Sequence, residues 1–228
     1  MAARPAPGPP PPVPEPWAAP PRGRVLWLAP HPDDETLGGG GTLALHRAQR
    51  DPVRVIFATD GGAGDPAGHY PPDRYVALRR EEARRAAEAL GGLDLEFWPY
   101  PDGTLAGVAD LDDRLAAAVA GYRPDVLYYP SAREGHPDHR ALGLGVEALH
   151  AAGRLPAPAY AYEVWTPLEP THVLDVTATI GRKRAALEAY PSQLRYNDYR
   201  PKILGLNAYR TITLPAPAAY AEAFRRLG

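Results

Sequence analysis

The chain has 228 residues, 45% of them hydrophobic, which suits one domain with a full hydrophobic core. Its formal net charge of −2 gives no bulk attraction to nucleic acid or to an anionic membrane. Because the chain has no cysteine, disulfides and thiolate metal sites are excluded. A bound metal would need nitrogen and oxygen ligands, which favours zinc, with Fe²⁺ as an alternative.

The first 22 residues contain ten of the 29 prolines. Proline has no backbone N–H to donate, so we expect residues 1–22 to be a polyproline-like or disordered extension without a helix or a sheet ladder. No apolar run approaches the roughly 20 residues needed to span a bilayer, and no apolar signal-peptide core stands at the N-terminus. The sequence therefore predicts no membrane insertion and a cytoplasmic location, and it leaves a homo-oligomer open.

From residue 23 to residue 228, strand-like and helix-like segments alternate, which predicts a single domain. The alternation predicts an α/β fold that is Rossmann-like, with a mostly parallel sheet and helices on both faces. We expect strands at Val25–Ala29, Val53–Ala58, Leu93–Trp98, Val126–Tyr129, Ala159–Val164 and Val173–Val176. We expect helices near Thr36–Arg50, Tyr75–Leu90, Leu111–Gly121, Asp138–Ala152, Ile180–Tyr190 and Ala216–Leu227.

A cluster of one histidine and three acids, His31-Pro32-Asp33-Asp34-Glu35, follows the first expected strand directly. Ligands of open α/β sheets bind just beyond the carboxyl ends of the strands. His31 and Asp34 can both reach one zinc ion across a tight turn, whereas Asp33 should point elsewhere and could accept a proton from an attacking water. The alternative is that the acids only favour the N-terminus of the following helix.

Four glycines, Gly38–Gly41, follow this cluster, but their spacing does not match the dinucleotide-binding fingerprint, and the acidic turn would repel a pyrophosphate. We expect the glycines to allow the helix to approach the sheet or the metal loop closely. The Gly- and Pro-rich segment Gly61–Asp73 follows the next strand and is expected to form a loop over the site, and Pro191–Arg200 is a second candidate for setting specificity.

A second cluster, His136-Pro137-Asp138-His139, follows the fourth expected strand. His139 can supply a third metal ligand. His136 could protonate a leaving amine or hydrogen-bond a developing oxyanion. Asp138 could orient His136 and raise its pKa, or it could cap the following helix; both interpretations remain open at this point.

These two motifs resemble those of the LmbE-like or PIG-L family of zinc-dependent de-N-acetylases. Weaker similarities extend the likeness to about residues 24–200 and include Thr59-Asp60-Gly61, Arg79-Arg80-Glu81-Glu82-Ala83, Pro101-Asp102-Gly103 and Tyr190-Pro191-Ser192-Gln193. The family includes N-acetylglucosaminyl-phosphatidylinositol deacetylases and the deacetylases of mycothiol and bacillithiol synthesis. Membership would imply removal of an acetyl group from an amino sugar.

The resemblance implies a role for each matching residue. It implies a metal bound by His31, Asp34 and His139, with Asp33 as general base and His136 as general acid or oxyanion stabiliser. Arg79 and Asp102 match positions that bind sugar-like substrates in the family. Glu134 stands where some relatives carry a tyrosine that assists the carbonyl oxygen.

Arg79 also draws attention by its position in the helical pattern, because it falls on the apolar stripe of its expected helix, four residues before Ala83. An arginine that faces inward there either binds substrate or pairs with a buried carboxylate such as Glu82.

We therefore predict a zinc-dependent hydrolase that removes the N-acetyl group of an N-acetylglucosamine-type conjugate, a small molecule. Two alternatives remain: an amidase with the same site that acts on a non-sugar N-acyl metabolite, and a metal- or sugar-binding module without catalysis. Asp33 argues against the second, since a pure binding site needs no extra carboxylate beside the water.

Overall fold

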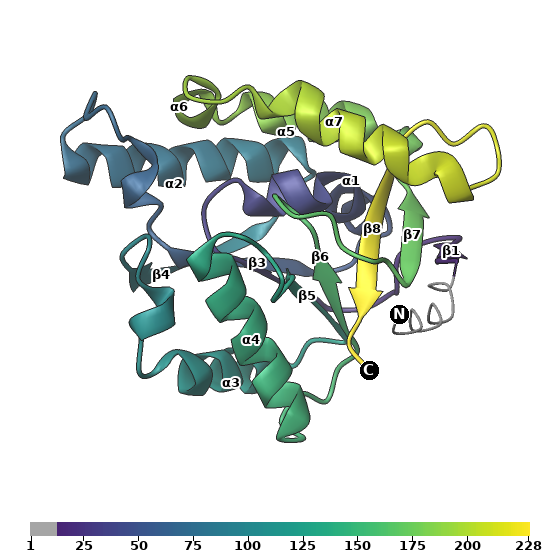
Figure 1. The fold of residues 1–228 in the computed structure, drawn as a ribbon, viewed down its shortest axis with the longest axis horizontal. Helices are drawn as coiled ribbons and strands as arrows, with labels where there is room; N and C mark the ends of the chain where they lie inside the picture. The colour runs from purple at the N-terminus through teal and green to yellow at the C-terminus, as the bar shows by residue number, and fades with distance from the viewer. Residues whose placement is uncertain (1–12) are drawn as a thin grey trace, which may run out of the picture.

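In the computed structural model, which describes residues 13–228, eight strands form a single sheet (Figure 1). Their order is β1-β7-β8-β6-β5-β2-β3-β4, and all neighbours are parallel except that β8 runs antiparallel to β6 and β7. The strands are β1 Glu15–Trp17, β2 Val25–Ala29, β3 Val53–Thr59, β4 Asp94–Tyr100, β5 Val126–Pro130, β6 Ala159–Tyr162, β7 His172–Asp175 and β8 Ala221–Arg226. The predicted α/β fold with a mostly parallel sheet is confirmed.

Helices cover both faces of the sheet (Figure 1). One core lies between the sheet and α1, α2 and α5, and a second lies between the sheet and α3 and α4. None of the helices that the structure describes combines the length and the apolar character needed to cross a bilayer. The helices are α1 Asp34–Ala48, α2 Pro72–Ala89, α3 Leu111–Tyr122, α4 Pro137–Ala151, α5 Ile180–Glu188, α6 Pro191–Leu194 and α7 Tyr199–Tyr209.

The order of the strands creates a switch point beside β2. From β2 the chain adds β3 and β4 on one side, and then crosses back to add β5 and β6 on the other. The loops that leave β2 and β5 therefore diverge to opposite sides of the sheet, which opens a crevice at their carboxyl ends. Both His/Asp motifs lie in these two loops, so the topology accounts for their meeting in space.

The glycine run of α1 allows the close approach that the sequence predicts. A Cβ atom added at Gly39 would lie 1.8 Å from the Trp27 ring, and one at Gly38 would lie 2.3 Å from the Tyr162 ring. Gly39 also departs from helical geometry and kinks the helix. The N-terminal half of α1 thus packs directly on the aromatic residues of the sheet, and this contact fixes the turn that carries the first motif.

Two buried polar side chains hydrogen-bond the backbone groups of α1 on either side of the kink. Glu222 of β8 accepts hydrogen bonds from the backbone N–H groups of Gly41 and Thr42, while Lys183 of α5 donates to the carbonyl of Leu37. Nζ of Lys183 and Oε1 of Glu222 are 2.7 Å apart, and both side chains are fully buried. The backbone groups freed by the kink are therefore satisfied by one buried ion pair.

Two predictions about the ends of the chain are wrong. The expected helix Ala216–Leu227 contains β8, which is paired on both sides inside the sheet; this pairing overrides the helix propensity of its alanines. Within the proline-rich extension, Glu15–Trp17 pairs with β7 at the edge of the sheet, where Pro16 is tolerated. The prediction for residues 1–12 lies outside the described residues.

Helix α7 was not predicted from the sequence.

Candidate active site

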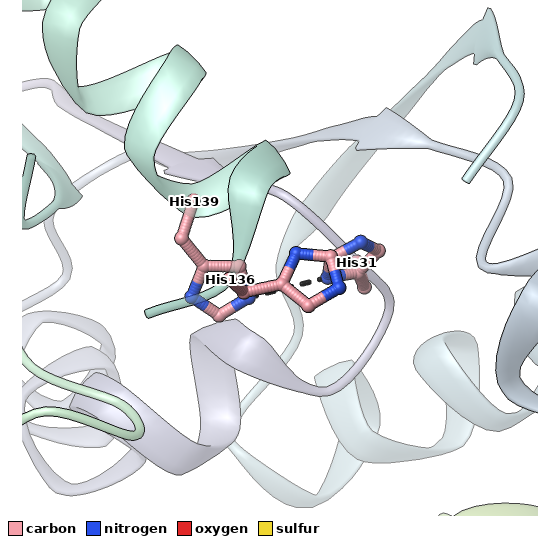
Figure 2. Close-up of side chains that lie close together, drawn as sticks. All are labelled: His31, His136 and His139. Atoms are coloured by element: carbon pink, nitrogen blue, oxygen red, sulfur yellow. Dashed lines mark hydrogen bonds between the residues drawn. The ribbon is translucent and has the colours of Figure 1, made fainter. Parts of the chain in front are cut away.

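Two histidines and one aspartate from the two motifs meet at the carboxyl ends of β2 and β5. Nδ1 of His31 lies 3.1 Å from Oδ2 of Asp34, and Nε2 of His139 lies 3.1 Å from the same oxygen. These two imidazole nitrogens are 3.3 Å apart. Figure 2 shows the rings of His31 and His139 close together, with His136 beside them. The structure thus brings together the three residues predicted to bind a metal.

Two further carboxylates, those of Asp102 and Asp138, contact the other nitrogen of the His31 ring. Nε2 of His31 lies 3.0 Å from Oδ1 of Asp102 and 3.1 Å from Oδ2 of Asp138. Burial lowers the pKa of His31, but hydrogen bonds to Asp102, Asp138 and Asp34 outweigh it and raise the pKa well above its ordinary value. An imidazole whose distal nitrogen is held by a carboxylate is the usual arrangement of a metal-binding histidine.

The contacts of Asp138 differ from both interpretations of the sequence, although its charge does act to raise the pKa of His136 as expected. Its carboxylate contacts His31 and accepts hydrogen bonds from the backbone N–H groups of Gly103 and Leu105, so it does not orient His136. The residue that caps α4 is His136, whose Nδ1 accepts from the backbone N–H of Asp138. Spacing along the motif could not reveal this, because the partners of Asp138 come from a distant loop.

The donor set fits a divalent metal ion such as zinc. Three ligands held at about 2.0–2.1 Å in tetrahedral geometry lie about 3.3–3.4 Å from one another, close to the separations of the His31, Asp34 and His139 atoms. The surrounding charge agrees with a bound cation. Four carboxylates gather around these ligand atoms, and the guanidinium of Arg79 pairs with only one of them, Asp33, so an excess of buried negative charge remains. The four carboxylates are Asp33, Asp34, Asp102 and Asp138.

Two other groups of three have ligand atoms within 4.8 Å of one another: His31, His136 and His139, and His31, Asp102 and Asp138.

Asp33 stands next to this centre in a strained backbone conformation. Its φ of 134° is rare for a residue with a side chain and costs on the order of 1–3 kcal/mol. Its backbone N–H donates to Oε2 of Glu35, and its carboxylate lies 3.4 Å from Nη2 of Arg79. Burial raises the pKa of Asp33 to about 7, although the positive charge of Arg79 opposes the shift. Burial also disfavours ionisation of Asp34, but His139 and His31 hold the pKa of that carboxyl well below its usual range.

Arg79 is buried and contacts two residues of the first motif. Its Nη2 donates to the carbonyl of Pro32 in addition to pairing with Asp33. The alternative partner named from the sequence, Glu82, lies 3.8 Å away and accepts its hydrogen bonds from Ser192 instead. Arg79 nevertheless lines the pocket, so its predicted contact with substrate stays a prediction.

His136 differs from its predicted protonation. Burial lowers its pKa, and the neighbouring His31 and His139 lower it further. Because Nδ1 accepts the N–H of Asp138, the neutral ring carries its proton on Nε2. These surroundings favour a neutral His136 whose Nε2–H is the hydrogen-bond donor.

A pocket of about 280 Å³ opens above these residues. Gly61, Ala63, Gly64 and Pro66 line it, so the segment after β3 does lie over the site as predicted, although α2 begins at Pro72. The segment Pro191–Arg200, the second candidate for setting specificity, contributes Gln193, Tyr196 and Tyr199 to the lining. Trp165 also lines the pocket, and neither a motif nor its spacing singled it out in the sequence.

Glu134 has a clear role in place of the family tyrosine. Its carboxylate accepts hydrogen bonds from three consecutive backbone N–H groups, those of Val164, Trp165 and Thr166, at 2.6–3.2 Å. Burial raises its pKa despite these bonds. Glu134 thus fixes the turn after β6 that carries Trp165 to the pocket.

The chain is similar in sequence to proteins named as deacetylases. It is 33% identical to a diacetylchitobiose deacetylase of Thermococcus kodakarensis over 57% of this chain and 50% of that protein. It is 32% identical to a Bacillus cereus protein named "Probable N-acetyl-alpha-D-glucosaminyl L-malate deacetylase 2" over 74% of this chain and 83% of that protein. The chain spans about half the length of the first relatives that it matches.

Solved structures share the fold. The N,N′-diacetylchitobiose deacetylase of Pyrococcus horikoshii superposes with a TM-score of 0.80 and 23% identity, covering 89% of this chain and 83% of that one. GalB of Pseudomonas putida, a 4-carboxy-2-hydroxymuconate hydratase, superposes with a TM-score of 0.75 and 25% identity over 90% and 96% of the two chains. The fold therefore accommodates more than one reaction.

The family model described as PIG-L, GlcNAc-PI de-N-acetylase, matches residues 26–150. That range contains both His/Asp motifs together with Arg79 and Asp102. The chain belongs to the PIG-L family.

Proposed function

We propose that this protein is a zinc-dependent hydrolase that removes the acetyl group from an N-acetylglucosamine-type amino sugar. The observation that carries the proposal is the convergence of His31, Asp34 and His139, with Asp33 beside them at the base of a pocket. The names of the relatives support the substrate class, since they are deacetylases of N-acetylglucosamine conjugates. Zinc is proposed from the donor set, with Fe²⁺ as the alternative.

The residues divide the work as follows. His31, Asp34 and His139 would hold the metal, which when bound polarises a carbonyl and lowers the pKa of a bound water to about 7. Asp33 accepts the proton of the attacking water. Its raised pKa lets it keep that proton near neutral pH and pass it to the nitrogen of the departing amine.

His136 acts on the carbonyl oxygen in this proposal. Its Nε2–H can donate a hydrogen bond to the oxyanion that develops when the amide carbon becomes tetrahedral. Because the pKa of His136 is lowered, we favour this role over proton donation to the amine. Arg79 and Asp102 remain proposed substrate contacts from the pocket wall, and Asp138 supports His31.

Glu35 is proposed as a positioning residue for the base. It accepts the N–H of Asp33 through Oε2, while Oε1 accepts the hydroxyls of Tyr190 at 2.6 Å and Thr36 at 2.5 Å. Arg79 holds the other side of the turn through Pro32. These buried contacts maintain the strained backbone of Asp33 and aim its carboxylate into the pocket.

Glu35→Ala is expected to lower kcat by about 10- to 100-fold, with little change in KM and in zinc content, because a misplaced base slows proton transfer without removing a ligand. Glu35→Gln is the matched control: its amide oxygen can still accept the N–H of Asp33, and the hydroxyls of Tyr190 and Thr36 can rotate to accept from the amide nitrogen. Activity near wild type in both variants would rule out the positioning role.

The proposed function is tested by incubating the purified protein with N-acetylglucosamine and its glycosides and measuring free acetate and free amine. We expect release of one acetate per amine, loss of turnover after removal of metal with a chelator, and recovery when zinc is returned. Hydrolysis of non-sugar N-acyl compounds alone would favour the amidase alternative, and binding without acetate release would favour the non-catalytic one.

The likeness to GalB favours a second candidate, a hydratase that adds water to an unsaturated carboxylate. The same base could activate water for addition to a carbon–carbon double bond. Loss of ultraviolet absorbance of a muconate-type substrate, without acetate release from any amide, would support this candidate. A cytoplasmic location, a homo-oligomer and the absence of nucleic-acid partners stay predictions.

A further inference from the structure

An exposed aromatic ring lines the site without a part in the proposed reaction. Trp165 lines the pocket and is 55% exposed, although the large apolar residues around it are mostly buried. Its ring lies edge-on to His136, with ring centroids 5.3 Å apart, and 5.9 Å from the His139 ring. An exposed indole beside the reacting groups is available to contact a bound molecule.

The backbone that carries Trp165 is held by hydrogen bonds. The buried carboxylate of Glu134 accepts both the N–H of Trp165 and those of its two neighbours, so the turn cannot swing freely. An aromatic residue held in place loses little conformational entropy when it binds a ligand. Glu134 and Trp165 therefore form a preorganised unit.

A second hollow adjoins the pocket beyond this ring. It measures about 330 Å³ and shares the lining residues Trp165 and Tyr199 with the first pocket, so the two spaces both border these side chains. Its other walls combine the aliphatic Val164 and Ile203 with the polar Asn197 and Lys202. At about 280 Å³ the first pocket is near the lower limit of about 300 Å³ for small-molecule sites, so a larger conjugate needs both spaces.

We propose that Trp165 is a stacking platform for the group joined to the N-acetylated sugar, and that the hollow beyond it accepts a second pyranose ring. A pyranose presents a flat, C–H-rich face that can pack on an indole, while its hydroxyls need partners such as the amide of Asn197 and the ammonium of Lys202. A small carboxylate aglycone has no such face and would use Lys202 alone. The mixed lining therefore favours a disaccharide.

This inference rests on the proposed function and names its substrate class. The test compares kcat/KM for N,N′-diacetylchitobiose with kcat/KM for N-acetylglucosamine in four proteins: wild type, Trp165→Ala, Trp165→Phe and Tyr209→Ala. Tyr209 is an exposed aromatic residue, 61% accessible, that does not line either space. We expect wild type to prefer the disaccharide by about tenfold or more, Trp165→Ala to lose most of that preference, and Trp165→Phe and Tyr209→Ala to keep it. The ratio is the readout because loss of the ring could also disturb His136.

Equal kcat/KM for the two sugars in wild type, or a preference that survives Trp165→Ala, would overturn the platform while leaving the proposed function intact. A preference for a malate glycoside of N-acetylglucosamine that disappears in Lys202→Met would overturn it in favour of a charged aglycone. Absence of acetate from every sugar would instead contradict the proposed function. In that case fluorescence titration with diacetylchitobiose still tests the platform, since quenching should occur in wild type and be lost in Trp165→Phe.

Discussion

His139→Ala is expected to lose zinc and deacetylase activity together. His139 contributes one of three ligand atoms that lie 3.1–3.3 Å apart, and the remaining pair of His31 and Asp34 cannot enclose an ion. We expect the affinity for zinc to fall by about 10²-fold or more and kcat/KM by about 10³-fold or more, because both the Lewis acid and its fixed position are lost. Metal content after dialysis and acetate release measure the two effects.

His150→Ala is the matched control, since His150 is an exposed histidine on the same helix, α4. It should retain the zinc and the activity of wild type. A full equivalent of zinc in His139→Ala, bound as tightly as in wild type, would exclude His139 from the ligand set and would direct attention to the group of His31, Asp102 and Asp138.

Lys183→Met is expected to destabilise the fold by about 3–5 kcal/mol, a large part of the 5–15 kcal/mol that usually stabilises a domain. The substitution leaves Glu222 as a buried carboxylate without a cation, and it removes the donor to the carbonyl of Leu37. Urea unfolding followed by circular dichroism gives the free energy of unfolding. The α1 kink should loosen as well, since the same ion pair caps both of its halves.

Two further variants separate this effect from the loss of any charge. Lys183→Met combined with Glu222→Gln should cost less than the sum of the two single changes, because the second removes the unpaired charge created by the first. Arg225→Met breaks an exposed pair with Glu169, 3.4 Å apart, and should cost less than about 1 kcal/mol. A cost below about 1 kcal/mol for Lys183→Met would mean that the buried pair does not hold the kink.

The sequence allowed the fold to be predicted where local pattern and burial agree. Strands β2 and β5 are apolar runs, fully buried, and α2 buries the alanines of its apolar stripe, Ala83, Ala86 and Ala87. The pattern failed at β8, whose Ala221–Arg226 segment contains the buried Glu222 and helix-favouring alanines. This strand pairs with β6 and β7, and its buried Glu222 pairs with Lys183, and no local sequence window contains these partners.

The sequence allowed us to predict which residues form the candidate metal site, but not which contacts hold those residues in place. The motifs identify His31, Asp34 and His139, and the parallel topology brings them together at one edge. The sequence could not indicate that Asp138 and Asp102 support His31, because those contacts cross between loops. Glu134 and Trp165 were beyond local reasoning as well, since 31 residues separate them and their link is a carboxylate bonded to backbone N–H groups.

The division of roles between the two neighbouring aspartates is tested most directly by Asp33→Asn. We expect this variant to bind one equivalent of zinc as wild type does, because Asp34 is the ligand, while kcat for acetate release from an N-acetylglucosamine substrate falls by about 10²-fold or more. The asparagine keeps the shape of the side chain but cannot accept the proton of water. Loss of zinc from Asp33→Asn together with retention in Asp34→Asn, or full activity in Asp33→Asn, would contradict the account.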